Sequence, residues 1–397
     1  MLTLDQALER LLASAVPVDS IEDVDTLDAR GRVLAIPLVS SIAVPPMDNA
    51  EMDGYAVRCA DLVSLPARLP VSQRIQAGHA AVALLPGTAA RIFTGAPIPH
   101  GCDAVVMQEA ARAEADQVTF VETPQPGQWI RRSGLDIAAG ATVLRAGTRL
   151  RAPELGLAAS LGKACVPVHR RVRVGVLYTG DELVMPGQPL GPGRIYNSNR
   201  FTLRGLLQAL DCEVVDLGIV PDDPDLTRRA IVQAASATDL VISSGGVSVG
   251  EADHVKAAVR AEGSIDLWQI AIKPGKPLAF GHVRGVPFIG LPGNPVSSLV
   301  TFVLLARPFL LKLQGVADCL PRAIPMPAQF EVRRAGNRRE FLRVRVSSSG
   351  GLQAFETQDS AVLTSAAWAH GLADVAIGAT VAPGDMVPYL PFSELLA

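Results

Sequence analysis

The stretch DLVISSGGVSVGEADHVKAAVRAE, residues 239–262, carries the repeating unit of the central part of the chain. Its first residues, Asp239–Ser243, form an apolar, β-branched run typical of a buried strand, and Ala252–Glu262 has apolar residues at helical spacing. A glycine-rich loop joins the two segments. A strand, a loop and a helix in this order predict one βα unit of a parallel sheet.

The same alternation continues on both sides of this stretch. Further strands are predicted at Val172–Leu177, Glu213–Leu217, Asp266–Ile272, Leu278–Phe280 and Val286–Ile289. Further helices are predicted at Asn199–Leu210, with Asn199 as the N-cap, at Asp225–Ala235 and at Pro295–Leu313. The fold class that follows is a parallel-sheet α/β domain over residues 169–316.

The flanking regions lack this alternation. Residues 45–137 hold short β-rich segments between proline and glycine turns, which predicts a β-rich second domain. Residues 1–44 and 138–168, with helices over residues 3–14 and Pro153–Leu161, are expected to form a linking domain. Residues 317–397 predict a C-terminal β-barrel domain. Its expected strands are Phe330–Arg333, Glu340–Val346, Leu352–Phe355 and Asp385–Leu390.

Composition restricts the class of protein and the kind of partner. The 397 residues carry a net charge of −3 without a block of like charges, so attraction to nucleic acid or to a membrane is not expected. Aromatic residues make up 5%, too few for base-stacking platforms. The five cysteines form no C-x-x-C pair, and the N-terminal helix is interrupted by charges, unlike a signal peptide. These features predict a cytoplasmic protein.

Polar residues gather where the predicted strands end, and ligands of parallel sheets bind outside those ends. Carboxylates follow three strands, namely Asp181, Glu182, Asp222, Asp223, Glu251 and Asp253. A Pro-Gly turn carries two lysines, Lys273 and Lys276. The loop before the last helix contains Pro292, Gly293 and Asn294. Carboxylates beside lysines and glycines are expected where a divalent cation such as Mg²⁺ bridges protein and phosphate.

Each of these residues also has a plain structural interpretation. Asp222 and Asp223 lie between prolines and suit a turn or a helix cap, while Asp253 suits a helix N-terminus. Asn294-Pro295 is a typical helix start, and lysines on a Pro-Gly turn are typical of solvated surface. Their shared place at one sheet edge favours a functional site.

The glycine-rich loop admits two interpretations. Residues 246–250 fit G-x-S-x-G, the turn that presents a nucleophilic serine, here Ser248. The available histidines, His254, His282 and His370, lie in no recognisable catalytic setting, and no glycine-rich oxyanion segment precedes the loop. A backbone cradle for an anion is therefore favoured. Its expected members are Ser243, Ser244, Gly245, Gly246, Ser248 and Gly250.

A second group of polar residues precedes the central region. Its members are Asp48, Asn49, Asp53, Thr94, Gly95, Arg131, Arg132 and Asp136. Turn chemistry and surface ion pairs explain each residue taken singly. Two arginines beside threonine and glycine also suit an oxyanion such as phosphate or a tetrahedral metal oxide.

Eight segments, in this order, resemble the molybdopterin molybdenumtransferase family, which includes MoeA and the E domain of gephyrin. They are PPMDNAEMDGYAVR, FTGAPIPHGCDAVVMQE, IRRSGLDI, TGDEL, NSNR, SSGGVSVGEAD, IKPGKP and GLPGNPVSS. Each alone is a weak pattern, whereas the ordered set covers essentially the whole chain and is highly specific. The resemblance implies a MogA-like α/β domain that binds the pterin ligand. It also implies an elongated homodimer whose active site is shared between subunits.

The reaction implied by the resemblance inserts molybdenum from molybdate into adenylylated molybdopterin and releases AMP, with Mg²⁺ assisting. Functional roles carry over to Asp53, Thr94, Arg131, Asp136, Glu182, Asp222, Asp253, Lys273 and Ser365. The expected metal ligands are Glu182, Asp222 and Asp253. The loop of residues 243–250 is expected to bind the pterin or nucleotide phosphates, together with Lys273, Lys276, Pro292, Gly293 and Asn294. Expected partners are a MogA-like adenylyltransferase and molybdoenzyme-maturation proteins. A gephyrin-like scaffold is the alternative function.

The sequence departs from the family pattern at two places. Ala50-Glu51 stands where Ser-Ala is common, which adds a charge beside Asp53. Gln269 stands where related proteins often carry a lysine, so the site is expected to have one positive charge less.

Overall fold

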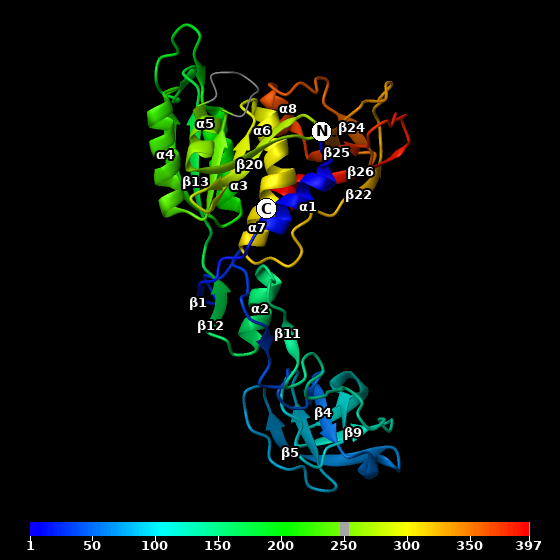
Figure 1. The fold of residues 1–397 in the computed structure, drawn as a ribbon. Helices are drawn as coiled ribbons and strands as arrows, with labels where there is room; N and C mark the ends of the chain where they lie inside the picture. The colour runs from blue at the N-terminus through cyan, green and yellow to red at the C-terminus, as the bar shows by residue number, and fades with distance from the viewer. Residues whose placement is uncertain (247–253, 397) are drawn as a thin grey trace. The chain divides into compact units, whose positions relative to one another are not determined.

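The computed structural model describes residues 1–246 and 254–396, which fall into two compact units, each with its own sheet and apolar core (Figure 1). The first unit comprises Met1–Ile36, Ala146–Arg151 and Val166–Ala397. The second comprises Pro37–Arg145 and Ala152–Cys165. The boundaries expected for four domains stay a prediction.

A six-stranded sheet forms the centre of the first unit. In spatial order its strands are β16 (Glu213–Val220), β13 (Arg173–Thr179), β17 (Leu240–Ser244), β21 (Val286–Leu291), β20 (Pro277–Val283) and β18 (Gly263–Gln269). The first four are parallel to one another, as the alternation of strands and helices predicts. β17 is buried along its whole length because helices cover both faces of the sheet.

The other edge of this sheet contains an antiparallel strand, which the prediction of a parallel sheet did not include. β20 runs antiparallel to both β21 and β18. Only Arg284 and Gly285 join β20 to β21, and both have positive φ (50° and 86°), as a two-residue hairpin turn requires. A parallel neighbour needs a crossover of about a dozen residues or more. β18 nevertheless ends at the same edge as β17 and β21, because Gln269 pairs with Pro277.

Helices cover both faces of the sheet (Figure 1). They are α1 (Leu4–Ser14), α3 (Ser198–Ala209), α4 (Pro224–Ala237), α5 (His254–Glu262), and α6 (Pro295–Thr301) and α7 (Arg307–Leu313), which flank a π-helical turn at Phe302–Ala306. One core joins α1, α3, α6 and α7 to one face, and a second joins α4 and α5 to the other. β17 supplies both cores by alternation: Leu240 and Ile242 pack into the first and Val241 into the second.

Two helix starts decide which polar side chains remain for a site. Asn197 is the N-cap of α3 and accepts a hydrogen bond from the Arg200 amide at 3.1 Å, so the prediction of Asn199 as the cap is wrong. Asn199 lies inside the helix, and its side-chain amide group bonds to Ser244 and Gly293 at the sheet edge, as described below. Asp223 is the N-cap of α4 and accepts from the Leu226 amide at 2.7 Å.

The continuous helix Pro295–Leu313 is the only one in the described part of the chain that is long and apolar enough to cross a membrane. Within the protein, 94% of its apolar window is buried.

A second sheet occupies the C-terminal part of the first unit. Its strands, in order, are β19 (Ile272–Lys273), β23 (Arg339–Val346), β25 (Gly371–Val375), β26 (Met386–Pro391) and β22 (Ile324–Pro327), with β24 (Leu352–Ala354) beside β23. Short helices α8 (Leu363–Trp368) and α9 (Phe392–Leu395) accompany it. The strand predicted at Phe330–Arg333 is wrong: this segment forms a single bridge, from Val332 to Val381.

The second unit is built on a β-sheet, as predicted. Its strands, in order, are β7 (Ala104–Met107), β4 (Gly54–Val57), β6 (Ala89–Ile92), β5 (Ala67–Ile75), β9 (Gln117–Phe120) and β8 (Ala111–Glu114). β5 and β6 are parallel and the other pairs are antiparallel. Smaller elements are β2 (Leu38–Val39) with β11 (Thr142–Leu144), β3 (Asn49–Ala50) with β10 (Ile130–Arg131), and α2 (Ala152–Ser160). Elsewhere β1 (Ile21–Asp25) pairs with β12 (Cys165–His169).

Candidate functional site

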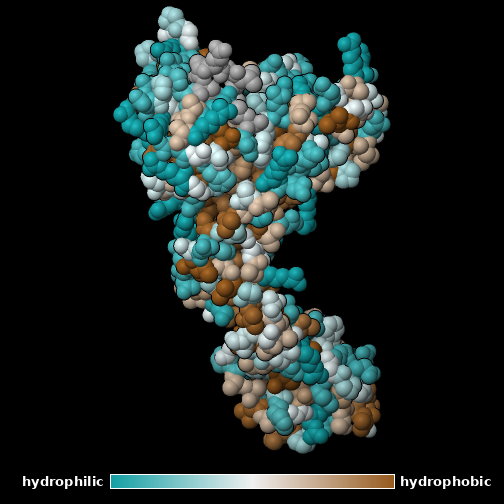
Figure 2. All heavy atoms as spheres, viewed as in Figure 1, coloured by the Kyte–Doolittle hydropathy of each residue, from teal (hydrophilic) through white to brown (hydrophobic). Residues whose placement is uncertain are grey.

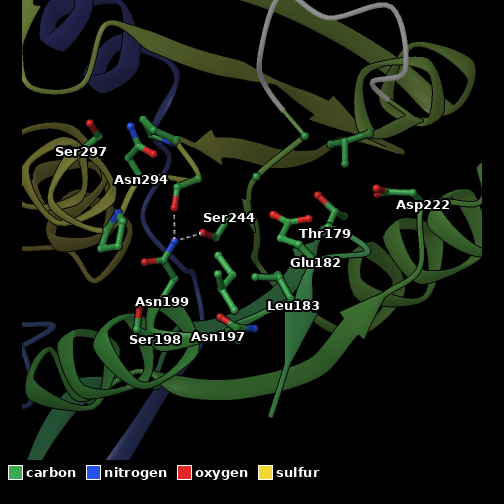
Figure 3. Close-up of a pocket in the computed structure, with 18 of the residues that line it drawn as sticks. Thr179, Glu182, Leu183, Asn197, Ser198, Asn199, Asp222, Ser244, Asn294 and Ser297 are labelled. Atoms are coloured by element: carbon green, nitrogen blue, oxygen red, sulfur yellow. Dashed lines mark hydrogen bonds between the residues drawn. The ribbon is translucent and has the colours of Figure 1, made fainter. Parts of the chain in front are cut away.

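The carboxyl edge of the central sheet holds a pocket of about 770 Å³ (Figure 3). Loops that follow β13, β16 and β17 line it, together with the start of α3 and the loop before α6. These loops lie side by side because parallel strands end at one edge of a sheet. The predicted site residues in the lining are Glu182, Asp222, Ser244, Gly245, Gly246, Pro292, Gly293 and Asn294.

Asn199 ties two of these loops together. Its Nδ2 donates to Ser244 Oγ at 2.9 Å and to the Gly293 carbonyl at 2.7 Å, as the dashed lines in Figure 3 show. Ser244 ends β17 and Gly293 follows β21, so one buried amide group bridges neighbouring strands at their carboxyl ends. The sequence analysis missed this role. The Asn-Ser-Asn-Arg segment gave no signal for which asparagine caps the helix and which one turns toward the sheet.

Three polar atoms of the pocket lining are buried without a hydrogen-bond partner among the described residues: Asn197 Nδ2, Asn199 Oδ1 and Thr227 Oγ1. Asn197 is 2% exposed and Thr227 is 0% exposed. Nearly all buried polar groups in folded proteins have a partner, and an unpaired one costs about 1–3 kcal/mol. Their concentration in one lining is typical of a site whose polar groups are completed by a ligand or by ordered water.

The loop after β17 requires glycine at two successive positions. Gly245 and Gly246 have φ angles of +93° and +67°. A Cβ on Gly245 would lie 2.8 Å from the Thr179 carbonyl oxygen, and one on Gly246 would lie 2.4 Å from Val255 Cγ2. The backbone therefore passes closer to its neighbours than any other residue permits.

The backbone cradle expected in this loop is only partly described. The Gly245 amide donates to the Leu291 carbonyl at 3.1 Å, so this amide is not one of the bare donors of such a cradle. Ser243, another expected member, is fully buried, and its Oγ donates to the Gly245 carbonyl at 3.4 Å. Three predicted site residues lie outside the described residues: Ser248, Gly250 and Asp253.

Two carboxylates line the pocket, those of Glu182 and Asp222. Asp222 is held by Asp181, because the backbone amide of each residue donates to the carboxylate of the other. Carboxylate oxygens are ligands that Mg²⁺ prefers. Within the described residues, no group of three or more His, Cys, Asp or Glu side chains is placed to hold a metal ion. Glu182 and Asp222 are therefore two carboxylates of the chemical type that binds Mg²⁺.

The lysine turn lies at the same sheet edge but outside the pocket lining. Lys273 Nζ lies 3.2 and 3.3 Å from the two carboxylate oxygens of Glu340, and β19 pairs with β23 at these residues. Lys276 is exposed, and its carbonyl accepts from the Ile270 amide. Between the lysines, Gly275 packs so closely on α6 that a Cβ would lie 2.4 Å from Thr301 Oγ1. The C-terminal sheet and α6 together fix this turn.

The C-terminal domain contributes to the pocket through a segment that the sequence analysis missed. Ala361 lines the pocket, and the neighbouring Ser360 accepts a hydrogen bond from Asn294 Nδ2 at 2.9 Å. The Ser360 carbonyl also accepts from the Val296 amide at 3.0 Å. Small residues outside any motif gave no sequence signal for this contact.

Ser365, also a predicted site residue, lies inside the C-terminal domain. It is fully buried, and its Oγ donates to the Val362 carbonyl at 2.6 Å and accepts from Arg343 Nε at 3.2 Å. Burial lowers the pKa of the Arg343 guanidinium to about 10. The structure thus places Ser365 beside a buried arginine, and not in the lining of the pocket.

In the second unit, Asp53 and Thr94 form one hydrogen-bonded pair. Asp53 Oδ1 accepts from both the amide and the Oγ1 of Thr94, each at 2.8 Å. These bonds, with the backbone bond as the largest cause, hold the pKa of Asp53 below its ordinary value. Arg131 and Asp136 are both exposed, with Arg131 in the short strand β10.

The neighbouring arginine makes the ion pair expected of this segment. Arg132 Nη1 lies 2.6 Å from Asp48 Oδ2, and the Ser133 amide donates to Asp48 Oδ1 at 2.8 Å. The Ser133 bond is the largest cause that lowers the pKa of Asp48, with Arg132 adding to it. Arg131 keeps its exposed side chain outside this pair.

The central sheet, the polar pocket at its carboxyl edge and the two β-rich parts are typical of a multidomain protein with a small-molecule site at the sheet edge. Three family models match the chain: the MoeA N-terminal region (domain I and II) at residues 2–162, a probable molybdopterin binding domain at residues 175–312, and the MoeA C-terminal region (domain IV) at residues 325–392. The chain belongs to the MoeA family.

Individual relatives agree over nearly the whole length. A molybdopterin molybdenumtransferase of Haemophilus influenzae is 46% identical over 346 residues, which cover 86% of this chain and 85% of the relative. A molybdopterin molybdenumtransferase of Nostoc is 38% identical over 388 residues, 93% of this chain and 89% of the relative. The crystal structure of a molybdopterin biosynthesis MoeA protein from Pyrococcus horikoshii has a TM-score of 0.86 at 28% identity, covering 98% of this chain and all of that one. The predicted family and fold class are confirmed.

Proposed function

We propose that this protein is a molybdopterin molybdenumtransferase, which inserts molybdenum derived from molybdate into adenylylated molybdopterin and releases AMP. The observation that carries the proposal is the pocket at the carboxyl edge, with its three unpartnered buried polar atoms. A volume of about 770 Å³ suits a ligand of the size of a pterin joined to a nucleotide. Relatives that bear this name span more than four fifths of the chain.

The pocket residues divide into two proposed groups. Asn197, Asn199 and Thr227 offer polar atoms to the ligand, and the bridge from Asn199 keeps the loops around it in register. Glu182, Asp222 and Asp253 are the proposed Mg²⁺ ligands. The ion, when bound, offsets the negative charge of the ligand phosphates. Without that cation these carboxylates would repel the phosphates.

The remaining predicted residues are proposed to act from the edges of the site. Lys273 and Lys276 add positive charge at the same sheet edge, and Ser365 acts through the buried Arg343. Asp53, Thr94, Arg131 and Asp136 belong to the second unit. In a homodimer, the second unit of one protomer is proposed to face the pocket of its partner. The four-domain division, a cytoplasmic location and delivery of the ligand by a MogA-like adenylyltransferase are part of the same proposal.

Release of AMP tests the proposal directly. The full-length protein is incubated with adenylylated molybdopterin, Mg²⁺ and molybdate, and AMP is quantified with and without molybdate. We expect molybdate-dependent release, and a loss of about 10²-fold or more for Asp222→Ala. Asp225→Ala is the matched control, because it removes a carboxylate from the first turn of α4 that does not line the pocket. A folded protein that binds the ligand and releases no AMP on addition of molybdate refutes the proposal.

A further inference from the structure

Two arginines of the second unit lie directly opposite each other on neighbouring strands. Arg74 on β5 and Arg91 on β6 are Cα partners in the parallel register, and Tyr55 on β4 is the partner of Arg91 on its other side. Cross-strand partners point to the same face of a sheet, so the two guanidinium groups share one surface. Like charges at directly opposite positions destabilise a sheet. Such a pair therefore calls for a compensating group.

Both guanidinium groups stack against the side chain of Phe93. The guanidinium carbon of Arg74 lies 4.8 Å from the centre of the Phe93 ring and that of Arg91 lies 4.7 Å from it. Arg91 also stacks on Tyr55 at 5.2 Å. The aromatic faces hold both guanidinium groups in place by cation–π attraction and leave their positive charge intact.

Among the described residues, no carboxylate forms a salt bridge with this pair, although Asp53 is close enough to Arg91 for its pKa to be lowered by that charge. Arg91 Nη1 donates to the Gly54 carbonyl at 2.9 Å and its Nη2 donates to the side-chain carbonyl of Gln108, both neutral acceptors. Arg74 is exposed and forms no salt bridge to a described residue. An exposed and a half-buried guanidinium group, neither in a salt bridge to a described residue, offer donors of the kind that bind the oxygens of an anion.

The surroundings place this pair beside the predicted site residues of the second unit. Asp53 senses the charge of Arg91, which contributes to its lowered pKa after the two bonds from Thr94 and against the effect of burial. Both Thr94 donors already serve Asp53 Oδ1. An anion at this end of the sheet must therefore be bound by other groups than Thr94.

We propose that Arg74 and Arg91, both stacked against Phe93, form a binding site for a tetrahedral oxyanion, phosphate or molybdate, on the second unit. The identity of the oxyanion rests on the proposed function, because that reaction contains both. The site itself rests on the register, the shared stacking on Phe93 and the absence of a salt bridge to a described residue.

Arginine side-chain NMR tests the site without turnover. In the ¹⁵N-labelled full chain, the Nε–Hε signals of Arg74 and Arg91 are assigned from Arg74→Gln and Arg91→Lys, and each oxyanion is titrated separately at low salt. We expect both signals to shift with phosphate, molybdate or both, and the one that acts at lower concentration is the bound species. Arg74→Gln is expected to weaken the response of Arg91 about fivefold.

Arg68 provides the matched control on the same strand. It is exposed and pairs with Glu114 at 3.0 Å, so Arg68→Gln makes the same charge change where the arginine already has a counter-ion. The proposal is overturned if neither Arg74 nor Arg91 shifts, or if Arg68 responds equally. In turnover, the KM for the bound oxyanion is expected to rise about fivefold in Arg74→Gln and to stay unchanged in Arg68→Gln. Oxyanion shifts in a protein without molybdate-dependent AMP release would uphold the site and refute the proposed reaction. Molybdate-dependent AMP release without those shifts would uphold the proposed reaction and refute the oxyanion site.

Discussion

Asp181 and Asp222 hold each other across the carboxyl edge of the central sheet. The Asp181 amide donates to Asp222 Oδ2 at 3.3 Å, and the Asp222 amide donates to Asp181 Oδ1 at 3.2 Å. Asp181 follows β13 and Asp222 follows β16, so the pair joins two loops that lie far apart in the sequence. Asp222 lines the pocket and Asp181 does not. Asp181 therefore positions a carboxylate that a ligand or a metal ion reaches.

Asp181→Ala removes the acceptor of the Asp222 amide and leaves the Asp222 side chain in place. We expect the Mg²⁺ concentration for half-maximal AMP release to rise about tenfold, as for other residues that orient a metal ligand. Asp181→Asn keeps an oxygen acceptor, so its Mg²⁺ concentration for half-maximal AMP release should lie between those of the unchanged protein and of Asp181→Ala. The measurement is the Mg²⁺ dependence of AMP release. Equal Mg²⁺ dependence in all three proteins would show that Asp222 needs no such support.

Asn199→Ala removes both bonds that bridge β17 to the loop after β21. Because Ser244 and the start of that loop are buried, we expect the free energy of unfolding to fall by about 1–3 kcal/mol, measured by urea denaturation. AMP affinity should fall as well, since the two loops lose their bridge. Asn294→Ala, which breaks a more exposed bond to Ser360, should cost less than about 1 kcal/mol. Similar losses in both variants would contradict a special role for Asn199.

Gly246→Ala tests the close backbone approach of the loop after β17. The new Cβ meets Val255 and the residue keeps a positive φ, so two penalties add. Gly285→Ala has a similar φ of +86° with nothing within 4 Å of the Cβ, and isolates the backbone penalty of about 1–2 kcal/mol. We expect Gly246→Ala to cost about 1–3 kcal/mol more. The double variant Gly246→Ala, Val255→Ala should recover part of that difference in thermal unfolding. No recovery would place the cost elsewhere.

Thr94→Val removes one of the two bonds to Asp53 and should raise the pKa of Asp53 toward its ordinary value. In the unchanged protein the folded-state pKa lies below the unfolded-state value of about 3.9. The carboxylate therefore adds stability above that pH, and the contribution is lost as the pH falls through the lower folded-state pKa. Carboxyl ¹³C NMR titration of Asp53 measures the change. Thr94→Ser keeps the hydroxyl and should titrate as the unchanged protein does. A Thr94→Val titration that is also unchanged would assign the shift to the backbone bond alone.

Strand and helix alternation was sufficient to predict the central sheet and the edge where its pocket lies. The antiparallel edge was not predictable in the same way, because an apolar run such as Leu278–Phe280 carries no information on direction. The antiparallel direction of β20 follows from its two-residue connection to β21, Arg284 and Gly285, whose positive φ angles form a tight hairpin turn. The prediction of Asn199 as the N-cap was wrong for a similar reason. Asn197 and Asn199 are both asparagines and both suit a helix cap, so only their tertiary contacts distinguish them.

The predicted site residues that lie together in one pocket lining are those whose loops the strand order brings to the same edge. Glu182, Asp222, Ser244 and Asn294 meet in one lining because four parallel strands end there. Ser360 and Ala361 come from the C-terminal domain, and no periodicity or motif links that domain to the sheet edge. The pairing of Lys273 with Glu340 was missed for the same reason, since the two residues are separated by a complete helix and a domain boundary.

Through β19, the turn that carries Lys273 and Lys276 is connected to both sheets of the first unit. β19 continues the segment that leaves the central sheet after β18, yet its hydrogen-bonded neighbour is β23 of the C-terminal sheet. A shift of β23 carries Lys273 with it, and a shift of the Ser360 segment carries the loop at Asn294. The C-terminal part of the first unit thus helps to hold the loop at Asn294, in addition to the central sheet. Without these contacts, the central sheet would keep its strands and its carboxylates but would lose the bonds that hold Lys273 and Asn294.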